Sequence, residues 1–156
     1  RDCGCHITAL ANALRILSVR ISGREPTPGA LLDALQDRLL LGITGFCDAP
    51  GLDFLSLLTN GGVCLATYED FGRGGTAPEG SRIIRRLRHG QVTVLNTRAH
   101  EARSSSDWTH YVTAFCDGRR IRIEDPDCSK PFGLGKVRRI FQCWLYVRAD
   151  RRRGKT

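Results

Sequence analysis

Residues 110–125 read HYVTAFCDGRRIRIED and predict the hairpin around which the rest of the fold is arranged. Asp117-Gly118 is a preferred pair for a two-residue turn of type I′ between two strands. With these two residues as the loop, the pairing places His110 directly opposite Asp125. Side chains alternate along a strand, so His110 and Asp125 lie on one face. The stretch therefore predicts a histidine and a carboxylate at the open end of a hairpin.

The predicted register also sorts the other side chains of the hairpin. The face of His110 holds Val112, Ala114, Ile121 and Ile123, and the opposite face holds Tyr111, Thr113, Arg122 and Glu124. Directly opposed residues have Cβ atoms roughly 4.5–5.5 Å apart, so the carboxylate of Asp125 can bond the imidazole. Such a bond fixes the tautomer of a catalytic base and stabilises its imidazolium. The alternatives are a histidine at the rim beside a solvated acid, and a two-residue slip that makes Asp127 the acid.

The N-terminal third of the chain has helical periodicity. One apolar face is formed by Ile7, Leu10, Ala11, Leu14 and Leu17, which recur at helical spacing from Cys5 onward. A second helix is expected to begin at Thr27 as N-cap with Pro28 in the first turn, and a third to lie within 51–62. The sequence thus opens with a helical half.

The remainder predicts a mainly antiparallel sheet. Strands are expected at 63–68 and 91–96, a glycine-rich loop at 69–80, a helix at 81–90, a polar lid loop at 98–107, and a segment at 137–148 that begins helical and ends as a strand. Helices followed by antiparallel strands define an α+β class. We expect one domain over residues 1–148 and a disordered basic tail over 149–156.

Composition excludes several classes of protein. With 156 residues, 41% hydrophobic and 26% charged, the chain is long and apolar enough for one globular domain. No apolar run approaches the ~20 residues of a membrane-spanning helix, so we expect a soluble protein, either cytoplasmic or secreted. The net charge of +8 accompanies no nucleic-acid-binding motif. We interpret it as solvated surface, with contact to acidic polymers or membrane surfaces through the arginine-rich tail. The start at Arg1, without Met or a signal peptide, predicts a trimmed or processed chain.

The seven cysteines do not predict a metal centre. Only Cys3 and Cys5 lie close together, and their spacing lacks the second pair that a structural zinc site needs. We therefore expect no metal and no organic cofactor. Cys5 opens the first helix, where free N–H groups and the helix dipole lower the pKa of a thiol. Cys5 is thus a candidate nucleophile, with an apolar packing role as the alternative.

Several motifs together resemble the papain-like cysteine peptidases, in particular the bacteriocin-processing (double-glycine leader) peptidase family. CHITALANALRIL resembles its nucleophile helix, and EGSRIIRRLRHGQVTVLN its helix and strand before the catalytic histidine. THYVTAF and IRIEDPD resemble its histidine strand and Asn-Asp-Pro motif, and Phe141 and Trp144 its closing Phe…Trp segment. The resemblance covers nearly the whole chain in the right order, and it implies a papain-like fold and a thiol hydrolase.

The resemblance also implies roles for particular residues. Cys5 would be the nucleophile, His110 the general base and acid, and Asp125 the orienting group. Cys3 is the alternative nucleophile, but Cys5 aligns the helix motif without a gap. His6 stands where the family usually has glycine, and the family's oxyanion glutamine would fall just before Arg1.

Two residues are candidates for lining the substrate. His6 neighbours Cys5 in sequence, although a surface position is its simpler interpretation. Trp108 lies two residues before His110 and could wall a groove, with packing as the default role of tryptophan. The expected substrate is a peptide or protein.

Two other functions stay open at this point. The run Cys-x-x-Thr-Ala-Leu-x-Asn also resembles butirosin-type acyltransferases, which pass an acyl group to an amine through the same triad. A non-catalytic module with a basic binding face is the alternative from a different class. Release of free acid, transfer products, or binding that depends on the tail arginines would separate the three.

Overall fold

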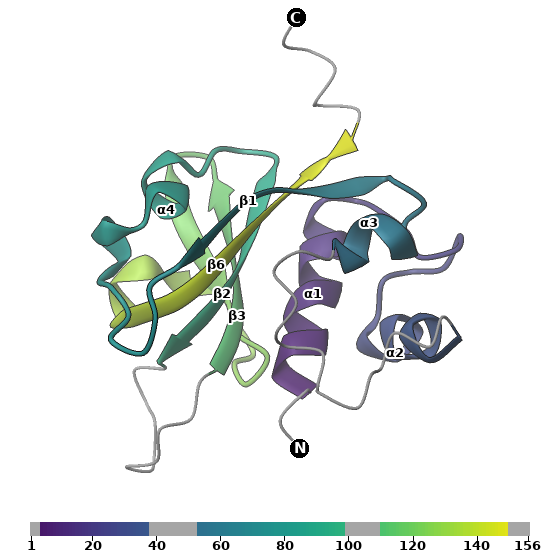
Figure 1. Ribbon diagram of the computed structural model, residues 1–156, viewed down its shortest axis with the longest axis horizontal. Helices are drawn as coiled ribbons and strands as arrows, with labels where there is room; N and C mark the ends of the chain where they lie inside the picture. Colours follow the sequence, from purple (N-terminus) through teal and green to yellow (C-terminus); the bar gives the residue numbers. More distant parts are fainter. Residues whose placement is uncertain (1–3, 38–52, 99–109, 150–156) are drawn as a thin grey trace, which may run out of the picture.

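The structure, a computed structural model, describes residues 4–37, 53–98 and 110–149. Within these ranges it contains four α-helices and one six-stranded sheet, which confirms the α+β class. In Figure 1 the helices of the N-terminal half gather on one side of the sheet, and the short helix α4 (Arg82–Arg86) lies on the other. None of the described helices is long and apolar enough to cross a membrane.

The helical half forms as the capping residues predict. The helices are α1 (Gly4–Ile16), α2 (Pro28–Asp37) and α3 (Phe54–Leu58). Thr27 Oγ1 accepts a hydrogen bond of 3.1 Å from the Ala30 N–H, so Thr27 caps α2 as expected. Asp53 caps α3 by accepting from the Ser56 N–H at 3.0 Å. Both α2 and α3 therefore start where a side-chain oxygen meets free helical N–H groups.

The sheet is antiparallel in all its pairings, with strand order β1-β6-β2-β3-β4-β5. Its strands are β1 (Val63–Asp70), β2 (Gln91–Arg98), β3 (His110–Asp117), β4 (Arg120–Glu124), β5 (Phe132–Gly133) and β6 (Arg139–Arg148). Between β1 and β2 lies α4 (Arg82–Arg86), preceded by a 3-10 turn at Pro78–Gly80, and a second such turn spans Leu134–Lys136. The last strand in sequence, β6, thus lies between β1 and β2.

Each face of the sheet carries its own apolar cluster. Leu10 and Leu14 of α1 pack with Val92 and Val94 of β2 on one face. The apolar cluster on the face of α4 includes Leu95 of β2. The side chain of Leu95 points to the opposite face of the sheet from that of its neighbour Val94. Fully burying one such side chain stabilises a fold by about 1.5–3 kcal/mol, so the two clusters fix α1 and α4 to opposite faces.

The predicted register of the β3–β4 hairpin is wrong by two residues. Asp117 pairs with Arg120, so the loop is Gly118-Arg119 rather than Asp117-Gly118. Of the two loop residues, Gly118 alone has a positive φ, 64°, as a type II′ turn requires. This register also places the opposite charges of Asp117 and Arg120 across from each other. Because the slip is two residues, the predicted division of side chains between the faces is unchanged.

The helical start predicted for residues 137–148 is also wrong. After the short turn at Leu134–Lys136, the segment enters β6, whose bounds are Arg139–Arg148. Ile140 is fully buried, pairs with Thr97 of β2 on one side and is bridged by Thr76 on the other. Pairing on both sides outweighs the helical spacing of a few apolar residues. The predicted lid beyond Arg98 and the tail beyond Ala149 lie outside the described residues.

Candidate active site

The structure brings the first turn of α1 to the start of β3. Cys5, half-buried, is the second residue of α1, and His110 is the first residue of β3. The Cys5 thiol and the His110 ring lie close enough for each to shift the pKa of the other. The helix is held on this strand by Thr113, whose buried hydroxyl donates to the Ala9 carbonyl at 2.7 Å. Packing of α1 against β3 therefore pairs a thiol and an imidazole that are far apart in sequence.

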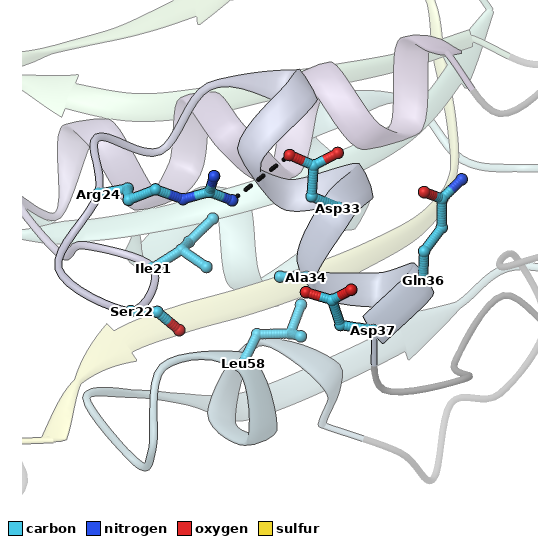
Figure 2. A pocket seen from close by; sticks show the side chains of 8 residues that line it. All are labelled: Ile21, Ser22, Arg24, Asp33, Ala34, Gln36, Asp37 and Leu58. Carbon is cyan, nitrogen blue, oxygen red and sulfur yellow. Dashed lines mark hydrogen bonds and ion pairs between the residues drawn. The ribbon is translucent and has the colours of Figure 1, made fainter.

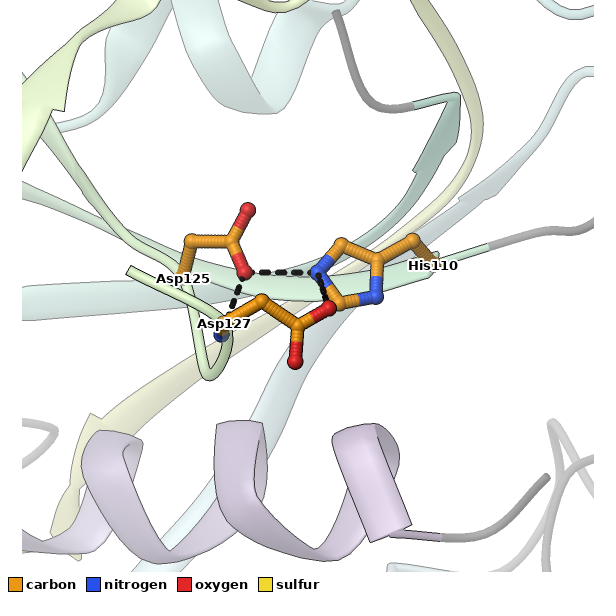
Figure 3. Close-up of side chains that lie close together, drawn as sticks. All are labelled: His110, Asp125 and Asp127. Atoms are coloured by element: carbon orange, nitrogen blue, oxygen red, sulfur yellow. Dashed lines mark hydrogen bonds and ion pairs between the residues drawn. The ribbon is translucent and has the colours of Figure 1, made fainter. Parts of the chain in front are cut away.

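The His110 ring also contacts a carboxylate. His110 Nε2 lies 2.6 Å from Asp125 Oδ1, and Nδ1, the other ring nitrogen, is not used by this contact (Figure 3). Asp125 is 8% exposed. The predicted contact is thus confirmed, although the predicted direct pairing is wrong, because the described β3–β4 ladder ends at Thr113 and Glu124.

A turn after β4, rather than the ladder, carries Asp125 to the ring. The Asp127 N–H donates to Asp125 Oδ1 at 2.8 Å, and the Cys128 N–H donates to the Asp125 carbonyl at 3.0 Å. This is an Asx-type turn, in which an aspartate side chain bonds the backbone two residues on. The Asp127 carboxylate lies 3.8 Å from His110 Nε2, but it is 82% exposed. Asp125 is therefore the buried partner and Asp127 the solvated one.

The environment of Cys5 favours its thiolate. Burial raises the pKa of the Cys5 thiol, but hydrogen bonds and the charge of His110 outweigh it, so the pKa lies below its ordinary value. The hydrogen bonds come from the His110 ring and from the backbone N–H groups of Tyr111 and His6. Each of these groups stabilises negative charge on sulfur, the nucleophilic form of cysteine.

The pKa values of His110 and Asp125 are shifted in the directions that favour the charged form of each group. Burial lowers the pKa of His110, but the hydrogen bonds and charges of Asp125 and Cys5 raise it to about 10. Burial raises the pKa of Asp125, whereas the bonds from His110 and the Asp127 N–H hold it below its ordinary range. The three groups therefore favour a thiolate, an imidazolium and a carboxylate together.

His6 lies beneath the site rather than on the surface. Its side chain is 6% exposed and stacks on Tyr111, with ring centroids 4.0 Å apart and planes at 9°. Burial lowers the pKa of His6 to about 3, so its ring is neutral. The surface interpretation of His6 is wrong, and a contact with substrate stays a prediction. The other two candidates, Cys3 and Trp108, lie outside the described residues.

Backbone groups complete the site in ways that the sequence did not predict. No residue type in the sequence indicates that the Tyr111 N–H bonds the Cys5 sulfur, because only the packing of α1 on β3 brings these two groups together. The Asp127 N–H had a signal in the Asp-Pro-Asp run at 125–127, which is typical of an Asx turn.

Two other features could hold ligands. His110, Asp125 and Asp127 offer ligand atoms within 4.8 Å of one another, so a divalent cation could bind there in competition with the proton on His110. A separate cavity of about 420 Å³ is bounded by helices α2 and α3 and by the turn that follows α1 (Figure 2). It is lined by Ile21, Ser22, Arg24, Asp33, Ala34, Gln36, Asp37 and Leu58. None of the three residues of the site lines this cavity.

Comparison of the chain with protein-family models, curated proteins and solved structures finds no match.

Proposed function

We propose that the chain is a papain-like cysteine peptidase that hydrolyses a peptide or isopeptide bond through Cys5, His110 and Asp125. The observation that carries the proposal is the 2.6 Å contact of His110 with Asp125, on a ring that also interacts with the Cys5 thiol and lowers its pKa. A nucleophile, a base and an orienting group in this order form the constellation that acyl-transfer enzymes use.

The reaction would proceed in two halves. The Cys5 thiolate attacks the carbonyl carbon of the scissile bond, and His110 gives its proton to the leaving amine as the C–N bond breaks. The resulting thioester is attacked by water, which His110 deprotonates, and the C–S bond breaks to release the acid and restore the thiol pair. Cys5 lies in the first turn of α1, where N–H groups lack helical acceptors, so its own N–H is a candidate donor to the oxyanion.

Alkylation with iodoacetamide at neutral pH tests the nucleophile directly. Cys5 is expected to react at least tenfold faster than Cys128, an exposed thiol of the same chain, because more of it is thiolate. Mapping of the modified peptides gives both rates in one sample. Equal rates at the two cysteines would contradict an activated thiolate at Cys5.

Turnover requires a separate measurement. A peptide mixture incubated with the protein is expected to yield new free carboxyl termini, and the Cys5→Ser variant to yield none above background. Transfer of acyl groups to added amines in place of hydrolysis would favour an acyltransferase. Equal product formation by the protein and by the Cys5→Ser variant would contradict catalysis by Cys5.

A further inference from the structure

A line of polar side chains crosses the sheet on the face of α1 and leads away from the candidate active site. Asn96 of β2 pairs with Gln142 of β6, which pairs with Asp70 of β1. Asn96 Nδ2 donates to Gln142 Oε1 at 3.1 Å, and Gln142 Nε2 donates to the Tyr68 hydroxyl at 2.9 Å. We call Asn96, Gln142, Tyr68 and Asp70 the polar row.

The polar row begins beside the nucleophile. Asn96 pairs with Tyr111, whose N–H bonds the Cys5 sulfur. A line of aromatic contacts runs in the same direction, because the rings of His6 and Trp144 are 5.9 Å apart and those of Trp144 and Tyr68 are 5.4 Å apart. The row thus lies on the face that carries Cys5 and at the end of the sheet where β3 begins.

The far end of the polar row carries an exposed negative charge. Asp70 accepts hydrogen bonds from the Gly72 N–H at 2.7 Å, the Tyr68 hydroxyl at 3.0 Å and Gln142 Nε2 at 3.3 Å. These described donors are all neutral, and they lower the pKa of Asp70. A carboxylate has about four acceptor positions, so Asp70 keeps capacity for a cation.

At the near end of the polar row, Asn96 Oδ1 is buried and has no hydrogen-bond partner within the described residues.

We propose that the polar row is a substrate subsite in which Asp70 binds the cationic side chain of a lysine or arginine. The proposal rests on the proposed function, since it assigns a side-chain preference to the same site. From β3 to β1 the sheet has three strand spacings of ~4.8 Å, so Asp70 lies roughly 14 Å along the sheet from Tyr111. An extended peptide advances about 3.3 Å per residue. The basic residue is therefore about four positions from the scissile bond.

Binding to an inactive protein tests the subsite without relying on turnover. The Cys5→Ala variant is offered N-acetylated, C-amidated decapeptides in which lysine, arginine, glutamine or glutamate occupies one position at a time. Lysine and arginine are expected to be enriched at a single position. In Cys5→Ala/Asp70→Asn this enrichment falls about threefold to fivefold, as for a solvent-exposed ion pair. The amide introduced by this substitution keeps an acceptor for the Gly72 N–H, which protects the local turn.

Two further variants make the test specific. Cys5→Ala/Glu79→Gln removes the same charge from an exposed residue outside the polar row and is expected to keep the full enrichment. Cys5→Ala/Asp70→Lys is expected to enrich glutamate at that position instead. Enrichment of basic residues that persists in the Asp70 variants, or no enrichment at all, would overturn the subsite.

The test of the Asp70 subsite can fail independently of the test of Cys5 as the nucleophile. Asp70→Asn, with Cys5 intact, is expected to leave the iodoacetamide rate at Cys5 unchanged, because iodoacetamide is neutral and does not reach the row. A slower rate would overturn the subsite by showing that Asp70 acts on the nucleophile. If Cys5 is unreactive even in the unmodified protein, the proposed function fails while the peptide preference still stands or falls on its own.

Discussion

Two thiols on opposite faces of the sheet, Cys5 and Cys143, have opposite electrostatic surroundings. Both pack against apolar side chains, Cys5 beside the cluster under α1 and Cys143 within the cluster under α4. Cys5 meets a ring that carries a proton and two backbone N–H groups, and its pKa is lowered. Burial and the charge of Glu69 raise the pKa of Cys143 to about 12, despite a 3.7 Å contact with the Ser81 hydroxyl.

The contrast shows that the hydrogen bonds and charge of a neighbouring group, and not burial alone, separate a reactive cysteine from a structural one. Burial raises the pKa of both thiols. His110 reverses that effect at Cys5, whereas Glu69 adds to it at Cys143. At pH 7 a thiol with a pKa near 12 is thiolate only about once in 10⁵ molecules, which makes it inert to alkylation.

Removal of the His110 imidazolium is expected to raise the pKa of Cys5 toward that of Cys143. In His110→Ala the thiol loses its side-chain hydrogen bond and the adjacent charge, so its pKa rises and alkylation at pH 7 slows by about 100-fold. Iodoacetamide labelling with peptide mapping measures the rate. The exposed Cys128 of the same variant is the internal control and keeps its rate. An unchanged rate at Cys5 would exclude His110 as the group that activates it.

The pair formed by His110 and Asp125 is expected to make stability fall as the pH rises. A group whose pKa is raised on folding contributes stability that is complete below its unfolded pKa, ~6.5, and is lost as the pH rises through the folded value. That folded value is about 10 for His110 beside Cys5, and it is lower in Cys5→Ser, which lacks the contribution of the thiol. In Cys5→Ser, where the thiol does not titrate, urea unfolding should lose on the order of 2 kcal/mol between pH 6.5 and 9.

The matched control for this pH dependence is Cys5→Ser/His110→Gln, which has no imidazolium to stabilise. Its free energy of unfolding should vary less over the same interval. Parallel curves for the two proteins would show that the His110–Asp125 contact adds no protonation-linked stability.

The two carboxylates beside His110 are expected to differ in their effect on Cys5. Asp125→Asn removes the buried charge at 2.6 Å and should slow alkylation of Cys5 by about tenfold, because the imidazolium is less stable. Asp127→Asn removes a solvated charge at 3.8 Å and should change the rate by less than threefold. The same labelling assay ranks them, and a larger effect at Asp127 would reverse their roles.

On the other face, Glu69 is expected to affect stability and the pKa of Cys143 together. Its carboxylate accepts from the Ser81 hydroxyl at 2.6 Å and from the Arg82 N–H at 2.9 Å at the start of α4. Glu69→Gln should therefore cost about 1 kcal/mol in urea unfolding. It should also lower the pKa of Cys143, measured from the pH dependence of thiol alkylation. Cys5 is the control, and a shift there would mean that the two faces are coupled.

Local patterns determined much of this molecule in advance. Apolar spacing predicted α1, the cap at Thr27 predicted the start of α2, and alternation placed His110 and Asp125 on one face of the hairpin. These features depend on neighbours in sequence, through helix N–H groups that need a cap and side chains that alternate in a strand. The α+β class and the antiparallel sheet follow from the same signals.

Only the tertiary structure decided the features that depend on distant segments. The loop at Gly118 could be closed in two registers with the same faces, and the pairing of Asp117 with Arg120 belongs to one of them. Residues 139–141 are strand, against their helical spacing, because β2 pairs with this end of β6 on one side and Thr76 bridges Ile140 on the other. The approach of Cys5 to His110, and of the Tyr111 N–H to the sulfur, results from the packing of α1 on β3. Sequence determined which groups exist and which face they take, whereas packing between distant segments decided which of them meet.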